Sequence, residues 1–196
     1  MRPDLAAIQK RIPTGARVLD LGCGDGSLLR FLSDNKKVIG YGLEIDADGI
    51  QECFAKGVPV IEQDLDAGLE NFDSNSFDLV VMTQALQAIN YPDRVLEEML
   101  RIGREGIVTF PNFAHWRCRY HLLRTGTMPV SDSLPYSWYN TPNIHLCTFK
   151  DFEALCRERN IKILHRAVVD HNYENNWAMN LAPNWFGEVA FYHVSR

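Results

Sequence analysis

Three glycines alternate with other residues directly after a short apolar run. Gly22, Gly24 and Gly26 follow the run that begins at Arg17, and a helical pattern begins at Ser27. Glycines at this spacing let the chain turn sharply, and they let a ligand approach the backbone where a Cβ atom would block it. Because glycine loops also occur in ordinary turns, the context has to decide between a turn and a ligand site.

Carboxylates at two nearby positions favour the ligand site. Glu44 ends the apolar run 37–44, where a carboxylate can accept hydrogen bonds from both hydroxyls of a ribose. Asp20 lies two residues before Gly22, and its charge would repel a pyrophosphate but suits a cationic ligand. The third glycine also comes one residue earlier than in the dinucleotide-binding form G-x-G-x-x-G. The residues therefore predict a pocket for a ligand that contains a ribose and a positive charge.

Apolar and helical patterns alternate along most of the chain. Strands are predicted at 17–19, 37–44, 58–65, 76–83 and 105–111, and helices at 3–11, 27–32, 47–56 and 92–103. This alternation predicts an α/β fold, in which helices flank a parallel sheet. In the helix 92–103, Val95, Leu96, Met99 and Ile102 form one apolar face, which predicts a core position.

The last third of the chain departs from the alternation. Thr148 caps a helix predicted at 149–159, and two β-rich runs follow at 161–170 and 185–194. The segment between these runs is rich in Asn and Pro and is too short for a regular crossover helix. The two runs are therefore expected to pair antiparallel.

The order of these motifs resembles that of the class I S-adenosylmethionine-dependent methyltransferases. Residues 18–26 read Val-Leu-Asp-Leu-Gly-Cys-Gly-Asp-Gly, and Gly-Leu-Glu-Ile-Asp follows at 42–46. The third and fourth strands of that superfamily match 58–65 and 76–83, and the loop 84–87 borders the ligand. The resemblance implies a Rossmann-like fold, with a mostly parallel seven-stranded sheet that ends in an antiparallel hairpin and helices on both faces. It also implies S-adenosylmethionine or S-adenosylhomocysteine as the cofactor.

The resemblance gives roles to the candidate binding residues. The glycine loop cradles the methionine part, Glu44 holds the ribose, and Asp64 lies by the adenine amine. The implied cofactor-binding residues are Asp20, Gly22, Cys23, Gly24, Asp25, Gly26, Glu44, Ile45, Asp64, Leu65 and Thr83. Cys23 is expected to pack rather than to act as a nucleophile. No catalytic residue is assigned, because an activated sulfonium can react through proximity and alignment alone.

A long segment rich in aromatic residues and proline separates the fifth strand from the capped helix. We call this stretch, at about 112–146, the cap segment, and we expect it to be an ordered insertion in a single domain that spans 1–196. Four of its aromatic side chains are expected to anchor it to the domain, although a functional role for the group stays open. They are Trp116, Tyr120, Trp138 and Tyr139.

Basic side chains of the cap segment have two interpretations each. Arg117, Arg119 and Arg124 could bind a carboxylate or an acidic partner, although a solvated helix face is the commoner explanation for such charges. In a helix, Arg117 and Arg124 share one face and Arg119 points elsewhere. His115 and His145 could act as bases, but packing is the commoner role for a histidine beside aromatic residues.

Two stretches of the cap segment narrow the resemblance to one family. Phe-Pro-Asn-Phe-Ala-His-Trp-Arg at 110–117 and Leu-Pro-Tyr-Ser-Trp-Tyr-Asn-Thr-Pro-Asn-Ile-His-Leu at 134–146 are similar to the MetW family of methionine-biosynthesis proteins. Members of that family work with a homoserine O-acyltransferase, which implies an accessory or regulatory protein that senses S-adenosylmethionine or its demethylated product. The alternative is a working methyltransferase that acts on a small molecule or a protein. The loop 83–89 lacks the acidic and Asn-Pro-Pro-aromatic signatures of several such enzymes, which favours the accessory role.

Composition and charge argue against several other classes of protein. The 196 residues are 46% hydrophobic and carry a formal net charge of −5 at pH 7, which fits one globular core and argues against a general nucleic-acid-binding surface. No stretch approaches the length of a membrane span, and residues 1–5 lack the apolar centre of a signal peptide, so we expect a cytoplasmic protein without a membrane partner. The five cysteines form no C-x-x-C pair, so we expect reduced thiols and no metal site.

Overall fold

A computed structural model of the chain describes residues 7–169, 179 and 181–196. The strands are β1 (Arg17–Leu21), β2 (Ile39–Glu44), β3 (Val60–Glu62), β4 (Phe77–Thr83), β5 (Gly103–Pro111), β6 (Lys162–Val169) and β7 (Val189–Ser195). The helices are α2 (Ser27–Lys36), α3 (Ala47–Ala55), α4 (Pro92–Ile102), α5 (Trp116–Thr125), α6 (Phe149–Glu158) and α8 (Pro183–Phe186). Two short 3₁₀ helices are η1 (Leu65–Ala67) and η2 (Leu86–Ala88). Within these ranges, no helix is long and apolar enough to cross a membrane.

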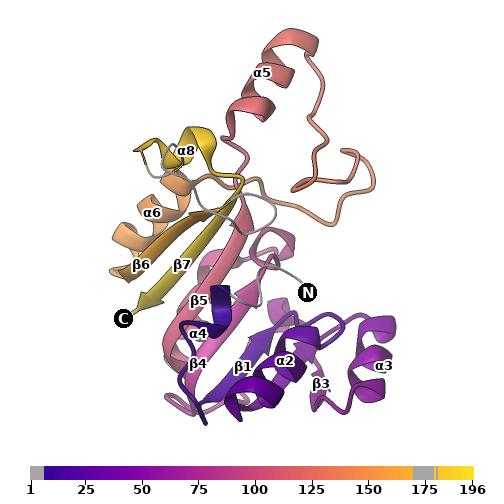
Figure 1. Cartoon of the computed structure of the whole chain (residues 1–196), viewed down its shortest axis with the longest axis vertical. Coiled ribbons are helices and arrows are strands. Elements are labelled where there is room, and N and C mark those ends of the chain that lie inside the picture. Colours follow the sequence, from indigo (N-terminus) through magenta and orange to yellow (C-terminus); the bar gives the residue numbers. More distant parts are fainter. Residues whose placement is uncertain (1–6, 170–178, 180) are drawn as a thin grey trace.

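The seven strands form one sheet in the order β3-β2-β1-β4-β5-β7-β6 (Figure 1). Neighbours among β1 to β5 run parallel, whereas β7 runs antiparallel to both β5 and β6. The expected mostly parallel sheet with an antiparallel end is therefore confirmed.

Alternate residues of the central strands point to opposite faces of the sheet and build two cores. Leu19 and Leu21 of β1 belong to a core with residues of α4 and α6, whereas Val18 belongs to a second core with residues of α2. Apolar residues at both phases of the strand period are typical of a sheet that helices cover on both faces. The predicted apolar face of α4 lies in the first core.

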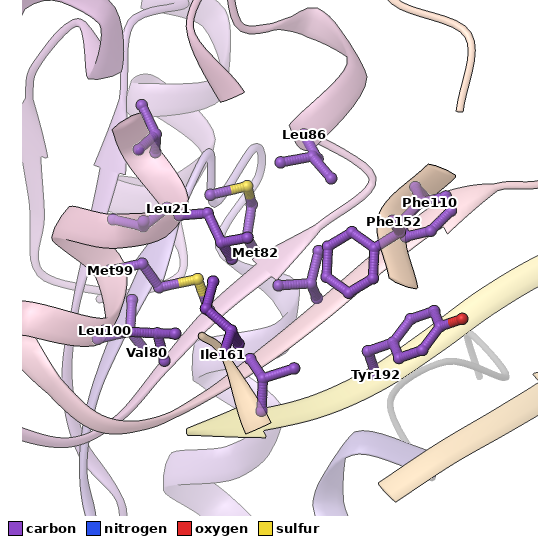
Figure 2. Close-up of a cluster of buried hydrophobic side chains, with 14 of the residues drawn as sticks. Leu21, Val80, Met82, Leu86, Met99, Leu100, Phe110, Phe152, Ile161 and Tyr192 are labelled. Carbon is purple, nitrogen blue, oxygen red and sulfur yellow. The ribbon is translucent and has the colours of Figure 1, made fainter. Parts of the chain in front are cut away.

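Figure 2 shows part of the first core, where the antiparallel strands join the parallel ones. The ring of Tyr192 on β7 lies 4.6 Å from the ring of Phe152 on α6 and 6.0 Å from that of Phe110 on β5, centroid to centroid. The Tyr192 hydroxyl donates to Glu153 Oε1 at 3.0 Å, so its polar end is satisfied. This packing fixes the end of β5, from which the cap segment departs.

The predicted strand 185–194 begins too early. Trp185 and Phe186 lie in α8, and β7 begins only at Val189. Pro183 occupies the first turn of α8, where its fixed φ favours a helix, and this local signal outweighs the β propensity of the two aromatic residues.

Other predicted boundaries also differ from the observed ones. Strand β5 begins at Gly103, directly after α4, so the expected connection before Glu105 is absent. The predicted helix 3–11 lies partly outside the described residues, and its described part is helical at 7–9.

The chain leaves the sheet after β5 and returns to the same place before α6. Phe113 N donates to Cys147 O at 3.0 Å, which joins the two ends of the excursion. Between them, α5 projects away from the sheet (Figure 1). The bounds of the cap segment and its place in a single domain stay a prediction.

Candidate ligand site

The strand order reverses between β1 and β4, and a cavity opens at this point. Strands β2 and β3 lie on one side of β1, and β4 and β5 lie on the other. Ligands of open α/β sheets bind outside the carboxyl ends of the strands at such a reversal. The cavity has a volume of about 320 Å³, and six of the eleven predicted binding residues line it. They are Gly22, Glu44, Ile45, Asp64, Leu65 and Thr83.

The three loop glycines are required for different reasons. All three have a positive φ, of 71° at Gly22, 54° at Gly24 and 71° at Gly26. A Cβ atom at Gly22 would lie 2.9 Å from Ala85 Cβ, and one at Gly26 would lie 2.8 Å from Cys53 Sγ. At Gly24 a Cβ atom would meet nothing within 4 Å. The protein's own packing thus explains Gly22 and Gly26, whereas Gly24 leaves open space for the close approach of a ligand.

Backbone donors fix the carboxylate of Glu44 at the wall of the cavity. Gly24 N donates to Glu44 Oε2 at 2.7 Å, and Ile45 N and Asp46 N donate to Oε1 at 2.8 and 2.9 Å. An ionised carboxylate can accept about four hydrogen bonds, so the group keeps capacity for a ligand hydroxyl. This carboxylate therefore joins the glycine loop to the end of β2, and the binding of a ligand by these residues stays a prediction.

Two further carboxylates shape the wall beyond β3. Asp64 precedes η1 and accepts a hydrogen bond from Asp66 N at 2.9 Å. Asp66 accepts from Asn90 Nδ2 at 2.7 Å and from Asn90 N at 3.0 Å. Burial alone would raise the pKa of Asp66, but the hydrogen bonds from Asn90 and Tyr91 outweigh burial and lower it. These bonds join the loop after β3 to the residues just before α4.

Two of the predicted residues away from the cavity are buried beside the loop. Asp20 is 1% exposed at the end of β1. Cys23 is buried with its Sγ 3.8 Å from Cys53 Sγ, and burial together with the nearby Asp20 charge raises its pKa. Burial of Cys23 agrees with the expected packing role, and its contact with a ligand stays a prediction.

Asp25 ties the loop to the end of α3. Its carboxylate accepts from Ser27 N at 3.1 Å and from Lys56 Nζ, which also donates to Asp25 O at 2.8 Å. Burial alone would raise the pKa of Asp25, but the hydrogen bonds from Lys56 and Ser27 lower it from 3.8 to about 2. Its direct contact with a ligand stays a prediction.

We expect Asp25→Asn to lower the free energy of unfolding by about 1 kcal/mol at pH 7, after allowance for solvent screening of a partly exposed pair. Because folding lowers the pKa of Asp25, its stabilisation is complete above pH 3.8 and is lost as the pH falls towards 2. Urea unfolding at pH 7 and pH 2.5 should therefore show a difference from the wild type that shrinks in acid. Asp34→Asn is the control, because the Arg30–Asp34 pair is 52% exposed on both sides. An equal loss for both variants would contradict the special role of Asp25.

The returning end of the cap segment closes one side of the cavity. Ile144 N and His145 N both donate to Gln87 O, at 2.8 and 3.0 Å, and Pro142 and Asn143 line the cavity. Gln87 is 5% exposed, and its Nε2 donates to Gln84 O at 2.8 Å. These contacts were not predicted from the sequence, although the family stretch 134–146 contains Pro142 and Asn143.

Other lining residues were also missed as site residues. They are Leu43, Gln63, Asp66, Gln84, Ala85, Ala88 and Ile89. The loop that contains Gln84 and Ala85 was expected to border the ligand, and their positions at the cavity agree with that expectation. The remaining five residues could have been inferred from the predicted site residues beside them, because each lies near a strand end or in the turn next to one.

The prediction that four aromatic residues anchor the cap segment is wrong. Trp116, Tyr120, Trp138 and Tyr139 are 42%, 56%, 74% and 73% exposed. Backbone hydrogen bonds attach the segment instead, from Phe113 N to Cys147 O and from Ile144 N to Gln87 O. The aromatic residues are therefore available for contacts outside the described chain.

The two histidines of the cap segment differ. His115 is 7% exposed, and burial lowers its pKa, which confirms the packing role. His145 is exposed, and its Nε2 lies 3.3 Å from Asn90 O, so packing does not describe it. In the described ranges, no three His, Cys, Asp or Glu side chains group as metal ligands.

Solved structures confirm the fold. An S-adenosylmethionine-dependent methyltransferase from Mesorhizobium loti superposes with a TM-score of 0.71 at 17% identity, covering 99% of this chain and 98% of that chain. The [4+2]-cyclase SpnF superposes with a TM-score of 0.67 at 18% identity, covering 99% of this chain and 80% of that chain. At these identities the likeness shows the fold alone.

Sequence comparisons identify the family. The family model described as methionine biosynthesis protein MetW matches residues 2–194. A relative from Rhodopirellula baltica, named bifunctional methionine biosynthesis protein MetXA/MetW, is 36% identical over 205 residues, which cover 98% of this chain. The match spans only 33% of that relative's length. The chain belongs to the MetW family of methionine biosynthesis proteins.

Proposed function

We propose that this chain binds S-adenosylmethionine or S-adenosylhomocysteine in the cavity and acts on a homoserine O-acyltransferase as an accessory or regulatory protein. The observation that carries the proposal is the Glu44 carboxylate, which Gly24 N holds at 2.7 Å beside the open space in front of Gly24. This pair supplies a hydroxyl acceptor next to a backbone that a ligand can approach closely.

The cavity suits the proposed ligand in size and charge. Its volume of about 320 Å³ lies at the lower end of the range for small-molecule sites, roughly 300–1,000 Å³. Glu44, Asp64 and Asp66 give its wall a negative charge, which attracts a sulfonium. In this arrangement the glycine loop receives the methionine part, Glu44 the ribose and Asp64 the adenine amine. When bound, S-adenosylmethionine would supply an activated methyl group.

The fused relative supports the choice of partner. Its name joins MetXA and MetW in one polypeptide, and we take MetXA to be the acyltransferase. A covalent link raises the effective concentration of one part beside the other, which is useful when the two act together. A separate MetW chain would then need a non-covalent contact with its partner.

A methyltransferase is the second candidate, and the amide side chains at the cavity are the groups that could orient its acceptor. Gln84 lines the cavity with φ 53°, a left-handed conformation that is uncommon outside glycine. Strained residues cluster at functional sites, and the side chains of Gln84 and Asn143 offer amides that could orient an acceptor. The fold does not choose between the candidates, because the [4+2]-cyclase SpnF shares it.

An acyltransferase assay tests the proposal. We expect the purified chain to change the rate of homoserine acylation several-fold, and we expect S-adenosylmethionine or S-adenosylhomocysteine to alter that change. Methyl-labelled S-adenosylmethionine in the same reactions should leave no label on the substrate, the product or the acyltransferase. An unaltered acylation rate together with labelled acceptor would instead establish the methyltransferase.

A further inference from the structure

Helix α5 carries an apolar stripe on its exposed side. Trp116, Tyr120 and Leu123 follow one another at helical spacing and are 42%, 56% and 86% exposed. Residues three and four positions apart lie side by side on a helix, so the three side chains form one continuous surface. We call them the α5 stripe. A surface helix normally turns such a stripe towards the core, which makes its exposure informative.

Residues on the other sides of α5 hold the helix against the rest of the protein. Cys118 is 4% exposed. Arg119 donates from Nε to Ala114 O at 2.6 Å, and its guanidinium carbon lies 4.4 Å from the centre of the Trp185 ring. These contacts attach the first turns of α5 to the residues that precede it and to α8. The stripe therefore points outward from a helix whose base is held, and the helix projects from the sheet (Figure 1).

The border of the stripe is basic. Arg117 and Arg124 lie on the helix face next to it, and the sequence of α5 contains no acidic residue. Arg117 Nη1 lies 4.0 Å from Glu188 Oε1, but the Arg117 side chain is 64% exposed, so the guanidinium can still face a partner. This local positive charge contrasts with the net charge of −5 of the whole chain.

We propose that the α5 stripe docks into an apolar groove on the homoserine O-acyltransferase and that Arg117 and Arg124 face acidic side chains at the border of that groove. This inference rests on the proposed function. A two-fold contact between two copies of α5 is a poor alternative, because it would bring the arginines of both copies together. The partner's border must therefore carry the opposite charge.

The position of the stripe suits a partner that responds to the ligand. The cap segment contains α5 near its start, and near its end it contains Asn143, which lines the ligand cavity, and Ile144, which bonds to Gln87. A partner on α5 and a ligand in the cavity would thus contact the two ends of one segment. The ends of that segment are joined to each other by the Phe113–Cys147 hydrogen bond.

Binding between the purified chain and the purified acyltransferase from the same organism tests the inference, measured by a biosensor at two salt concentrations. We expect the pair Tyr120→Asp and Leu123→Asp to weaken the complex at least tenfold. The pair Arg117→Glu and Arg124→Glu should slow association and reduce its dependence on salt. Phe54→Asp is the matched control, because Phe54 is 66% exposed on α3, and it should bind as the wild type does.

The possible results distinguish a failure of the proposed docking surface from a failure of the proposed function. All variants replace exposed residues, and unchanged circular dichroism and S-adenosylmethionine affinity would show that they fold. A wild-type complex that the α5 variants leave intact would overturn the docking surface but not the proposed function. Absence of any wild-type complex would overturn both. Self-association of the wild-type chain that the α5 variants abolish would favour a second copy and overturn the inference.

Discussion

Gly24→Val is expected to weaken the binding of S-adenosylmethionine and S-adenosylhomocysteine by at least about 100-fold, which corresponds to about 2.7 kcal/mol. A Cβ atom at this position meets nothing within 4 Å in the protein, and Gly24 N bonds to Glu44 at the cavity wall, so we expect a valine to project beside the space that we assign to the ligand. Isothermal titration of the variant and of the wild type measures the effect.

Gly15→Val is the control for backbone strain. Gly15 also has a positive φ, of 76°, and a Cβ atom there would likewise meet nothing within 4 Å. It precedes β1, however, at the opposite end of the strand from the cavity. Both variants should lose about 1–2 kcal/mol of stability, because each places an L side chain in a left-handed conformation. Only Gly24→Val should lose ligand affinity; equal affinities in the two variants would place the ligand elsewhere.

Glu44→Ala is expected to lower ligand affinity by about 5- to 150-fold, or about 1–3 kcal/mol, through the loss of a charge-assisted hydrogen bond to the ribose. The variant should also be less stable, because three backbone donors of the loop and of the end of β2 lose their acceptor. Titration gives the affinity, and urea unfolding gives the stability.

A neighbouring glutamate supplies the control for Glu44. Glu62 ends β3 and is paired with Glu44 in the register of the two strands. It is exposed and does not line the cavity. Glu62→Ala should therefore keep the wild-type affinity. A Glu44→Ala chain that binds ligand as tightly as Glu62→Ala would remove the ribose role from Glu44.

The central sheet could be predicted because its signals are local. Strand β4 reads as an apolar run, and its buried residues Leu79, Val80, Val81 and Met82 supply both cores. The glycine loop and Glu44 could likewise be located, because the loop directly follows β1 and Glu44 is the last residue of β2, which runs parallel to β1. Parallel strands bring their carboxyl ends to one edge, so sequence order alone places these residues together.

The rest of the site depends on contacts that no local pattern encodes. The hydrogen bonds from Ile144 N and His145 N to Gln87 O join backbone groups from distant parts of the chain, and backbone groups carry no sequence signature. The exposure of Trp138 was missed for a related reason. An aromatic side chain is suited equally to a core and to an interface, so residue type cannot distinguish the two.

Equilibrium binding of labelled S-adenosylmethionine and S-adenosylhomocysteine to the wild-type chain tests the central claim most directly. We expect saturable binding of one or both ligands at one site per chain, with each ligand displacing the other. Absence of saturable binding of either ligand by the folded protein at millimolar concentration would contradict it.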